Sequence, residues 1–175
     1  MKRTLTKNIG ILGGTFDPPH QGHIKISKEA KKKFNLDCVI WAVTKQNPFK
    51  SRTFFNLKYR INYSKKINKK NKFIKIGCYD SKIKSNRTIN LLKYFKIKYK
   101  NSNIYFLMGA DNLIHFHKWK NWKKITNICS ILVFDREGYK AKSLKSVSFK
   151  KLNKKGLHFI NFKKINISSS KLRKI

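Results

Sequence analysis

Acidic residues are scarce in this sequence, with 7 Asp and Glu against 43 Lys and Arg and a formal net charge of +36. Such a balance normally suggests a protein that binds nucleic acid or an anionic membrane surface. The basic residues are mostly lysines spread over nearly the whole chain, and Asn, Ile and Phe are also abundant. AT-rich codons encode these same residues, so codon bias is a sufficient explanation of the charge. We therefore expect no specific nucleic acid partner, although anionic substrates should be attracted and RNA should bind loosely and in a salt-dependent way.

Cysteine is also rare, and long hydrophobic runs are missing. Cys38, Cys78 and Cys129 lie far apart without a CxxC or metal-ligand spacing, which argues against a disulfide scaffold and against a cysteine metal site. Each lies in or beside an apolar run, so we expect buried free thiols. No apolar run approaches about 18 residues, and no apolar core of a signal peptide follows the basic N-terminal segment. The sequence therefore predicts a cytoplasmic protein with no membrane partner.

Two common nucleotide-binding fingerprints are absent: GxGxxG of dinucleotide-binding folds and GK[ST] of phosphate-binding loops. The N-terminal region instead has an apolar run, 9–12, followed by a Gly-Gly-Thr turn, 13–15, and two prolines. His20 and His23 follow at the start of a candidate helix. A strand, a glycine turn and a helix start allow backbone N–H groups to face an anion. The two histidines add donors that can be cationic near neutral pH.

The histidine segment also has less specific interpretations. The glycines could form only a tight turn, and a single histidine is more often packed in a core or exposed than functional. Two histidines at i, i+3 could bind a metal, but no third His, Cys or carboxylate lies nearby, so we expect no metal site at His20 and His23. Their position directly behind the glycine turn, with Gly22 leaving room between them, favours an anion site.

The remaining pattern indicates an α/β fold. Hydrophobic residues make up 40% of the chain and aromatic residues 13%, which disfavours disorder, and 175 residues suit one domain spanning residues 1–175. Continuous apolar runs predict buried strands at 9–12, 37–43, 73–77, 103–108 and 130–134, with an edge strand at 157–162. Helical spacing predicts helices at 24–34, 54–69, 88–100, 112–116 and 122–127. The loops are predicted at 44–52, 78–87 and 135–155, the last as a lysine-rich surface loop. This alternation predicts a Rossmann-like, doubly wound parallel sheet with helices on both faces and ligands beyond the carboxyl ends of its strands.

The segment Gly13–His23, GGTFDPPHQGH, resembles the (H/T)xGH motif of the nucleotidyltransferase superfamily, in the form typical of bacterial nicotinate-nucleotide adenylyltransferases. Further stretches match that family in order: 41–50 with an Asn-Pro-x-Lys loop, 87–92, 108–122 with a Gly-Ala-Asp-x-Leu and two-tryptophan block, and 167–173 with an Ile-Ser-Ser ending. The chain departs from the family pattern at Arg87, Asn90 and Leu91, where a tyrosine, an acidic residue and a threonine are usual. Ser170 replaces a threonine and keeps its hydroxyl. The resemblance implies the nucleotidyltransferase type of fold.

The resemblance implies an enzyme that transfers AMP from ATP to nicotinate mononucleotide, giving nicotinate adenine dinucleotide and pyrophosphate in NAD biosynthesis. The attacking phosphate is already an anion at neutral pH, so catalysis would consist of positioning and charge neutralisation without a general base. Mg²⁺ would bind mainly through the ATP phosphates and water. The alternatives are a phosphopantetheine or nicotinamide-mononucleotide adenylyltransferase, and a basic RNA-binding protein on an inactive nucleotidyltransferase fold. The oligomeric state is not predicted.

The resemblance also implies roles for individual residues. His20, His23 and Arg173 would be catalytic and would stabilise charge on the α-phosphate and the leaving pyrophosphate. The expected ATP-binding residues are these three with Gly13, Phe16, Gly109, Asp111, Arg136, Ser169 and Ser170, of which Arg136 is included for its position at the end of a predicted strand. Asp111 would bind a ribose hydroxyl, and the two serines would cap a C-terminal helix that holds the β- and γ-phosphates. The expected contacts of nicotinate mononucleotide are Gly14, Thr15, Asn47, Lys50, Thr88 near the carboxylate, and Trp119 stacked on the pyridine ring.

Overall fold

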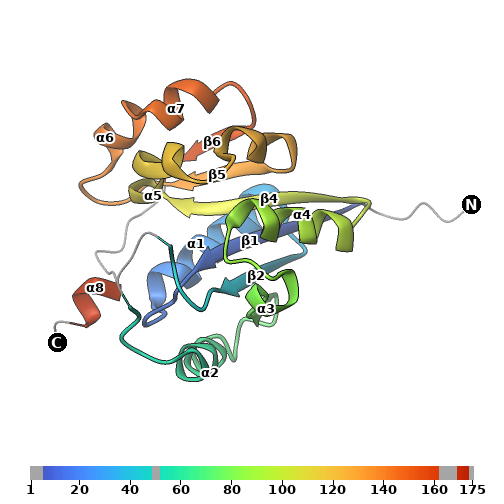
Figure 1. The fold of residues 1–175 in the computed structure, drawn as a ribbon, viewed down its shortest axis with the longest axis vertical. Helices are drawn as coiled ribbons and strands as arrows, with labels where there is room; N and C mark the ends of the chain where they lie inside the picture. The colour runs from blue at the N-terminus through green and yellow to red at the C-terminus, as the bar shows by residue number, and fades with distance from the viewer. Residues whose placement is uncertain (1–5, 49–51, 162–168, 174–175) are drawn as a thin grey trace, which may run out of the picture.

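The computed structural model describes residues 6–48, 52–161 and 169–173, and its centre is a parallel sheet (Figure 1). Across these residues the sheet has six strands in the order β3-β2-β1-β4-β5-β6. The strands are β1 (Lys7–Gly14), β2 (Cys38–Val43), β3 (Ile74–Gly77), β4 (Ser102–Gly109), β5 (Ser130–Phe134) and β6 (Leu157–Ile160). Every neighbouring pair is parallel. Because the order reverses between β1 and β4, their carboxyl ends form the switch point where such sheets bind ligands.

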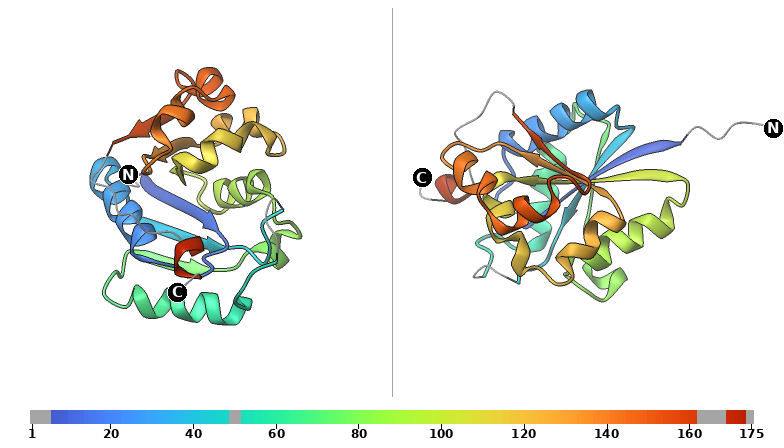
Figure 2. Two further views of the ribbon diagram at one scale, coloured as in Figure 1. Left: turned by 90° about the vertical axis from the view of Figure 1, so that its left-hand side faces the viewer. Right: turned by 90° about the horizontal axis from the view of Figure 1, so that it is seen from above.

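Helices cover both faces of the sheet (Figure 2). Against one face pack α1 (Gln21–Phe34) and α2 (Leu57–Ile67). Against the other pack α4 (Thr88–Lys98), α5 (Ala110–His115), the 3-10 helix η2 (Trp122–Asn127) and α7 (Val147–Leu152). The shorter elements are α3 (Asp80–Ile83), η1 (Phe116–Lys118), α6 (Lys140–Leu144) and α8 (Ser169–Leu172). None of the helices described is long and apolar enough to cross a membrane.

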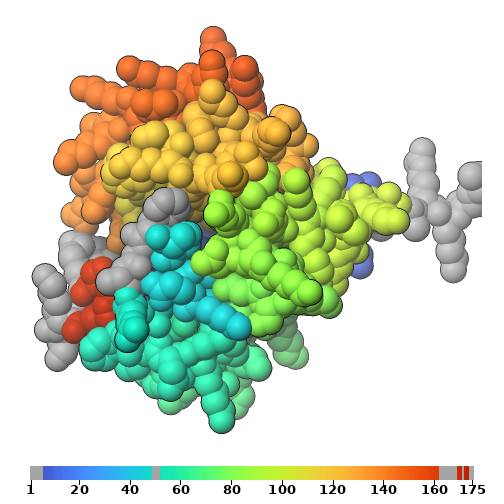
Figure 3. All heavy atoms as spheres, in the orientation of Figure 1, coloured from blue at the N-terminus to red at the C-terminus, as the bar shows by residue number. Residues whose placement is uncertain are grey.

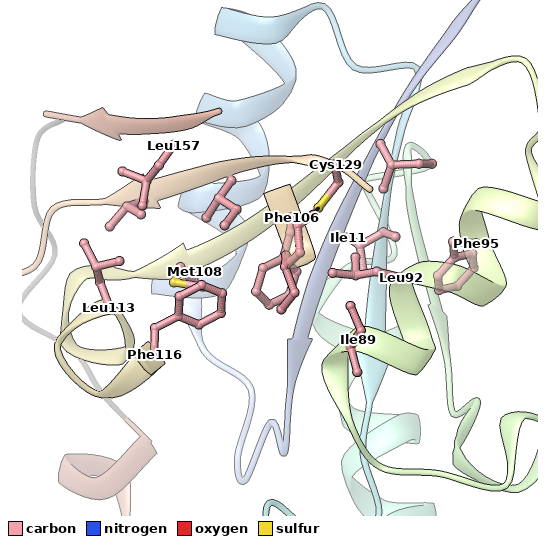
Figure 4. Packing of buried hydrophobic residues seen from close by; sticks show 14 of the residues in the cluster. Ile11, Ile89, Leu92, Phe95, Phe106, Met108, Leu113, Phe116, Cys129 and Leu157 are labelled. Carbon is pink, nitrogen blue, oxygen red and sulfur yellow. Dashed lines mark hydrogen bonds between the residues drawn. The ribbon is translucent and has the colours of Figure 1, made fainter. Parts of the chain in front are cut away.

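The core is divided into two clusters because residues along a strand alternate between the faces of the sheet. Ile11 of β1 packs with residues of α4 and α5, as does Phe106 of β4 (Figure 4). Leu12 and Leu107, the next residue in each strand, pack on the opposite face with residues of α1. Strands buried on both faces have continuous apolar sequences, and for this reason their positions could be predicted from the sequence.

The predicted strands and the helices at 24–34, 54–69 and 88–100 are confirmed with shifted ends. The edge strand expected at 157–162 ends at residue 160, and residue 162 lies outside the described residues. The helix expected at 112–116 begins two residues earlier, and that expected at 122–127 is a 3-10 helix. Two loop predictions are wrong. The segment 78–87 contains α3, and 135–155 contains α6 and α7, with Ser143, Ser148 and Leu152 buried. The inward positions of these last helices include serines, so their amphipathic pattern is hidden in the sequence.

The prediction of free thiols is confirmed for Cys38, Cys78 and Cys129, but only Cys129 is buried. Burial raises the pKa of the Cys129 thiol to about 12, so this group stays protonated at neutral pH. Cys38 and Cys78 are half-buried, which corrects the expectation that all three lie inside the core. Both flank the buried parts of their strands, Cys38 at the start of β2 and Cys78 just after β3.

Candidate active site

The turn between β1 and α1 lies at the switch point of the sheet. Phe16 has a positive φ of 50°, and the peptide bond between Asp17 and Pro18 is cis. Asp17 is buried, with only 4% of the residue exposed. Its carboxylate accepts hydrogen bonds from the backbone N–H groups of Phe54 at 2.7 Å and Phe55 at 2.9 Å. The turn is therefore fixed to the segment that leads into α2.

The two histidines after this turn form a reciprocal cap on α1. His20 is the N-cap residue, and its Nδ1 accepts a hydrogen bond from the Gly22 N–H at 3.1 Å. Nδ1 of His23 accepts from the backbone N–H of His20 at 3.2 Å. The ring centroids are 3.9 Å apart. Because a nitrogen that accepts a hydrogen bond carries no proton, each neutral ring has its proton on Nε2, and each can donate it to a ligand.

The environment of His20 in the unliganded protein favours the neutral ring. Burial, and secondarily the positive charge of Arg136, lowers its pKa to about 4. This corrects the expectation that the histidine donors can be cationic near neutral pH, as far as His20 of the unliganded protein is concerned. A neutral ring still donates a hydrogen bond from Nε2, so the group remains suited to an anion. A bound polyphosphate would favour the protonated form and raise this pKa.

Aromatic side chains pack against His23. The Phe16 ring is 2% exposed, and its centroid lies 4.8 Å from that of His23 and 4.9 Å from that of Trp41, on which it stacks. Trp41 Nε1 donates to Ser27 Oγ at 2.8 Å, and Ser27 Oγ donates to the His23 carbonyl at 2.9 Å. The Phe16 side chain thus supports the histidine, although Phe16 also lines the cavity that the histidines border.

A cavity of about 350 Å³ opens above the histidines, between the ends of β1, β4 and β5, the start of α1 and α8. It is bordered by nine of the ten residues expected to bind ATP: Gly13, Phe16, His20, His23, Gly109, Asp111, Arg136, Ser169 and Ser170. Residues from both ends of the sequence thus meet here. In the left view of Figure 2, α8 lies in front of the edge where the strands end.

Arg173 is the expected ATP residue that does not border this cavity. Its guanidinium donates to the Asp17 carbonyl and, at 3.3 Å, to Ser170 Oγ. Ser169 Oγ donates to the Pro18 carbonyl at 2.8 Å. The expectation that both serines cap the helix is wrong, since they are the first two residues of α8. In this structure α8 braces the turn that precedes the histidines.

Asp111 and Arg136, which also line the cavity, form an ion pair through Asp111 Oδ2 and Arg136 Nη1. The other carboxylate oxygen, Asp111 Oδ1, is buried and has no hydrogen-bond partner in the part of the chain that the structure describes. A Cβ atom at Gly109 would lie 2.5 Å from this oxygen. Gly109 therefore leaves room for the Asp111 carboxylate, whose Oδ1 can accept a hydrogen bond from a ligand hydroxyl.

A second cavity, of about 380 Å³, adjoins the first, and both are lined by Gly13, Gly14, Asn47, Phe106 and Trp119. Three of the segments that line it, 42–48, 80–91 and 118–120, are coloured cyan, green and gold in Figure 3, where they meet on one face of the molecule. Among the residues expected to bind the acceptor, Gly14, Asn47, Thr88 and Trp119 line this cavity. Thr15 lines only the first, and Lys50 is outside the described residues.

Arg60 is a structural residue of the site that the sequence analysis did not identify. Its side chain is 1% exposed and binds backbone carbonyls of three segments. Nη1 donates to Thr15 at 2.6 Å and Thr44 at 2.8 Å, Nη2 donates to Lys45 at 3.0 Å, and Nε donates to Phe55 at 3.0 Å. Burial lowers the pKa of this guanidinium, while the charge of Asp17 opposes the shift.

Asp80 is a second residue of this kind. Its Oδ2 accepts from Thr44 Oγ1 and from the Lys45 N–H, both at 2.7 Å, so it fixes the same loop from the side of α3. The sequence held a signal for Arg60, because it shares the helix face of Leu57 and Ile61, which pack against the core. For Asp80 there was none, since α3 was predicted as loop.

The fold and the histidine turn define a nucleotidyltransferase, and the comparisons with known proteins agree. The model of the cytidylyltransferase-like family matches residues 11–175. A solved structure of Plasmodium falciparum nicotinic acid mononucleotide adenylyltransferase with NaAD superposes with a TM-score of 0.75 at 24% identity. The match covers 96% of this chain and 83% of that chain, and it supports the fold.

The sequence relatives are more specific. A protein of Pelagibacter ubique named "Probable nicotinate-nucleotide adenylyltransferase" is 62% identical over 167 residues, which are 95% of this chain and 92% of the relative. A Clostridium novyi protein of the same name is 37% identical over 174 residues, covering 95% and 86%. The chain belongs to the nicotinate-nucleotide adenylyltransferase family.

Proposed function

We propose that this chain, acting as one nucleotidyltransferase domain, transfers AMP from ATP to nicotinate mononucleotide in NAD biosynthesis. The observation that carries the proposal is the pair of adjoining cavities. One is bordered by the histidine pair, Arg136 and the start of α8, which suit a triphosphate. The other is mainly apolar, with Trp119 and Phe106, and suits an aromatic base. The two meet at Gly13 and Gly14, where the absence of side chains lets both substrates approach the backbone.

In the proposed reaction, an oxygen of the acceptor 5′-phosphate attacks the α-phosphorus of ATP. A new P–O bond forms as the bond to the β-phosphate oxygen breaks, and pyrophosphate leaves with the electron pair. The attacking oxygen is already anionic, so no proton has to be removed from it. The Nε2–H groups of His20 and His23 stabilise charge on the α-phosphate and the leaving group, and their caps and the Phe16 ring hold them in place beforehand.

The remaining ATP contacts follow from the cavity. The buried Oδ1 of Asp111 accepts from a ribose hydroxyl beside Gly109. Ser169 and Ser170, with backbone N–H groups of α8, contact the β- and γ-phosphates. Arg173 holds the turn through the Asp17 carbonyl and supplies positive charge nearby.

The acceptor contacts are assigned to the second cavity. Trp119 stacks on the pyridine ring, Thr88 lies near its carboxylate, and Gly14 and Asn47 contact the mononucleotide. Thr15 contributes from the glycine turn, and Lys50 neutralises the acceptor phosphate. Trp119 is itself held by edge contacts with Phe106 and Phe116, whose centroids are 6.2 and 5.1 Å away.

Mg²⁺ fits this site as a companion of ATP. The described residues include no group of three or more His, Cys, Asp and Glu side chains that could hold a metal ion. An ion ligated by triphosphate oxygens and water needs no such group. When bound, it neutralises phosphate charge, while the histidines, the α8 N–H groups and Arg136 orient the chain of phosphates.

The test is release of pyrophosphate from ATP with competing acceptors. We expect nicotinate mononucleotide to support the reaction with the highest kcat/KM, ahead of nicotinamide mononucleotide and phosphopantetheine. Equal or better use of phosphopantetheine would contradict the proposed acceptor. Absence of pyrophosphate release with every acceptor, together with salt-sensitive RNA binding, would support an inactive RNA-binding protein instead.

A further inference from the structure

The acceptor cavity carries an unbalanced positive charge. Its charged lining residues are Arg87, Lys118, Lys120 and Asp80. The carboxylate of Asp80 binds the loop after β2, since its Oδ2 accepts hydrogen bonds from the Thr44 hydroxyl and the Lys45 N–H. Three exposed cations and one acidic residue thus line a mainly apolar cavity, and a negatively charged group on a bound ring would be favoured there.

Among these cations, Arg87 has the most defined position. It is the N-cap residue of α4, with an extended backbone at φ −89° and ψ 132°. Its backbone N–H donates to Ser85 Oγ at 3.1 Å, and the same oxygen accepts from Asn90 Nδ2 at 3.0 Å. The start of the side chain is therefore held in place between α3 and α4, beside Thr88.

The Arg87 guanidinium is available to bind a ligand. Among the described residues it has no hydrogen-bond or ion-pair partner, in contrast to those of Arg60, Arg136 and Arg173. A guanidinium presents two parallel N–H donors that match the two oxygens of a carboxylate, which a lysine ammonium does not. Arg87 also stands at the positive end of the 11-residue helix α4, which adds to the local potential.

We propose that Arg87 is a specificity-determining residue that favours a pyridine mononucleotide carrying a carboxylate over the same nucleotide carrying a carboxamide. The inference rests on the proposed function and assigns its acceptor preference to one side chain. The carboxylate and the carboxamide have nearly the same shape, so the apolar walls and Trp119 cannot separate them well. A positive charge that pairs with the carboxylate and not with the carboxamide can distinguish the two.

The experiment compares kcat/KM for nicotinate and nicotinamide mononucleotide in the wild type and in Arg87→Gln. We expect the ratio of the two values to fall roughly five- to tenfold, the range expected for a charge-assisted pair at a partly solvated site. The fall should come from a higher KM for the nicotinate substrate, with the KM for ATP unchanged. Arg87→Lys keeps the positive charge but lacks the two parallel N–H donors, so it should give an intermediate ratio.

Lys84→Gln is the matched control, because Lys84 is an exposed cation on the neighbouring α3 end that does not line the cavity. It should leave the ratio unchanged. An unchanged ratio in Arg87→Gln, or a larger change in Lys118→Gln or Lys120→Gln, would overturn the assignment to Arg87. An equal loss for both acceptors would also overturn it, since that indicates general attraction of phosphate. A wild type that adenylylates neither mononucleotide would instead refute the proposed function.

Discussion

At the scale of single residues, the site depends on which nitrogen of each histidine carries the proton. His20 and His23 use Nδ1 as acceptors of backbone N–H groups, so the fold itself selects the tautomer with a proton on Nε2. The same hydrogen bonds cap α1, which lacks acidic residues in its first turn. His20 therefore both stabilises the start of α1 and serves as a proposed phosphate donor. A substitution that tests one of these roles has to preserve the other.

The depressed pKa of His20 makes folding stability depend on pH. Unfolding restores the ordinary pKa near 6.5, so the unfolded chain binds a proton that the folded chain binds only near pH 4. Stability should consequently fall as the pH drops from about 6.5 towards 4, and should show no His20 contribution above that window. Urea unfolding at pH 7.5 and pH 5 measures this. His20→Asn keeps a capping oxygen without a titrating ring, so its pH dependence should be smaller than that of the wild type. An identical dependence in both proteins would contradict the assigned pKa.

Gly109 offers another test at this scale. Ala at this position would place a Cβ 2.5 Å from Asp111 Oδ1, so the carboxylate would have to move away from its pairing with Arg136. We expect Gly109→Ala to raise the KM for ATP roughly tenfold or more, as displacements of about 1 Å in a site commonly do. The KM for the acceptor serves as the internal control and should change little. If both KM values rise together, the effect of the substitution is not confined to the Asp111 pocket.

At the scale of elements, Arg60 joins three segments, of which the glycine turn and the loop after β2 line the two cavities. Its guanidinium binds carbonyls in the glycine turn, in the loop after β2 and in the segment before α2. The loop from β2 lines the acceptor cavity, so Arg60 is expected to position substrate residues without touching the substrate.

We expect Arg60→Lys to lower the free energy of unfolding by about 2–4 kcal/mol, since an ammonium cannot serve all four carbonyls. In the protein that remains folded, KM for the acceptor should rise more than KM for ATP. Chemical unfolding and steady-state kinetics at 15 °C would measure the two effects. Lys58→Gln, an exposed change on the same helix, is the control and should alter neither. Equal effects on both KM values would indicate a purely structural role.

At the scale of the whole molecule, the charge of +36 should act on substrates through long-range attraction. Raising the salt concentration from 50 to 200 mM should increase the KM for ATP several-fold, with little change in kcat. Any binding to unrelated RNA should fall far more steeply over the same range, because it depends on many phosphate contacts. Salt titration of both activities on one preparation checks this. RNA binding that resists salt and depends on sequence would argue for a specific nucleic acid function.

Sequence patterns predicted this fold well where burial is continuous. The strands of a parallel sheet are apolar on both faces, so Val39–Val43 and Ile131–Phe134 stand out in the sequence. The helices α6 and α7 were missed because serines occupy buried positions, where Ser148 Oγ accepts from the His117 N–H and Ser146 caps α7. Such hydrogen bonds exist only once the chain has folded and leave no periodic apolar signal.

The sequence predicted which residues form the site, but not their burial or their interaction partners. The histidine turn, Asp111 and the serines were predicted from motifs, and Arg136 from its position at a strand end; the fold brings them all to one cavity. The neutral state of His20 could not be predicted, because its causes are burial and an arginine from the end of β5. The bracing role of α8 and the buried contacts of Arg60 likewise arise from tertiary structure.

In the proposed reaction, His23 stabilises charge during AMP transfer to nicotinate mononucleotide. The most direct measurement is the rate of nicotinate adenine dinucleotide formation by the wild type, His23→Ala and His158→Ala, the last an exposed histidine on β6. We expect His23→Ala to lower kcat/KM by about 10²–10³-fold, the size of losing one preorganised donor, and His158→Ala to keep the wild-type value. A His23→Ala enzyme as active as the wild type, or a wild type that forms no dinucleotide, would contradict this proposal.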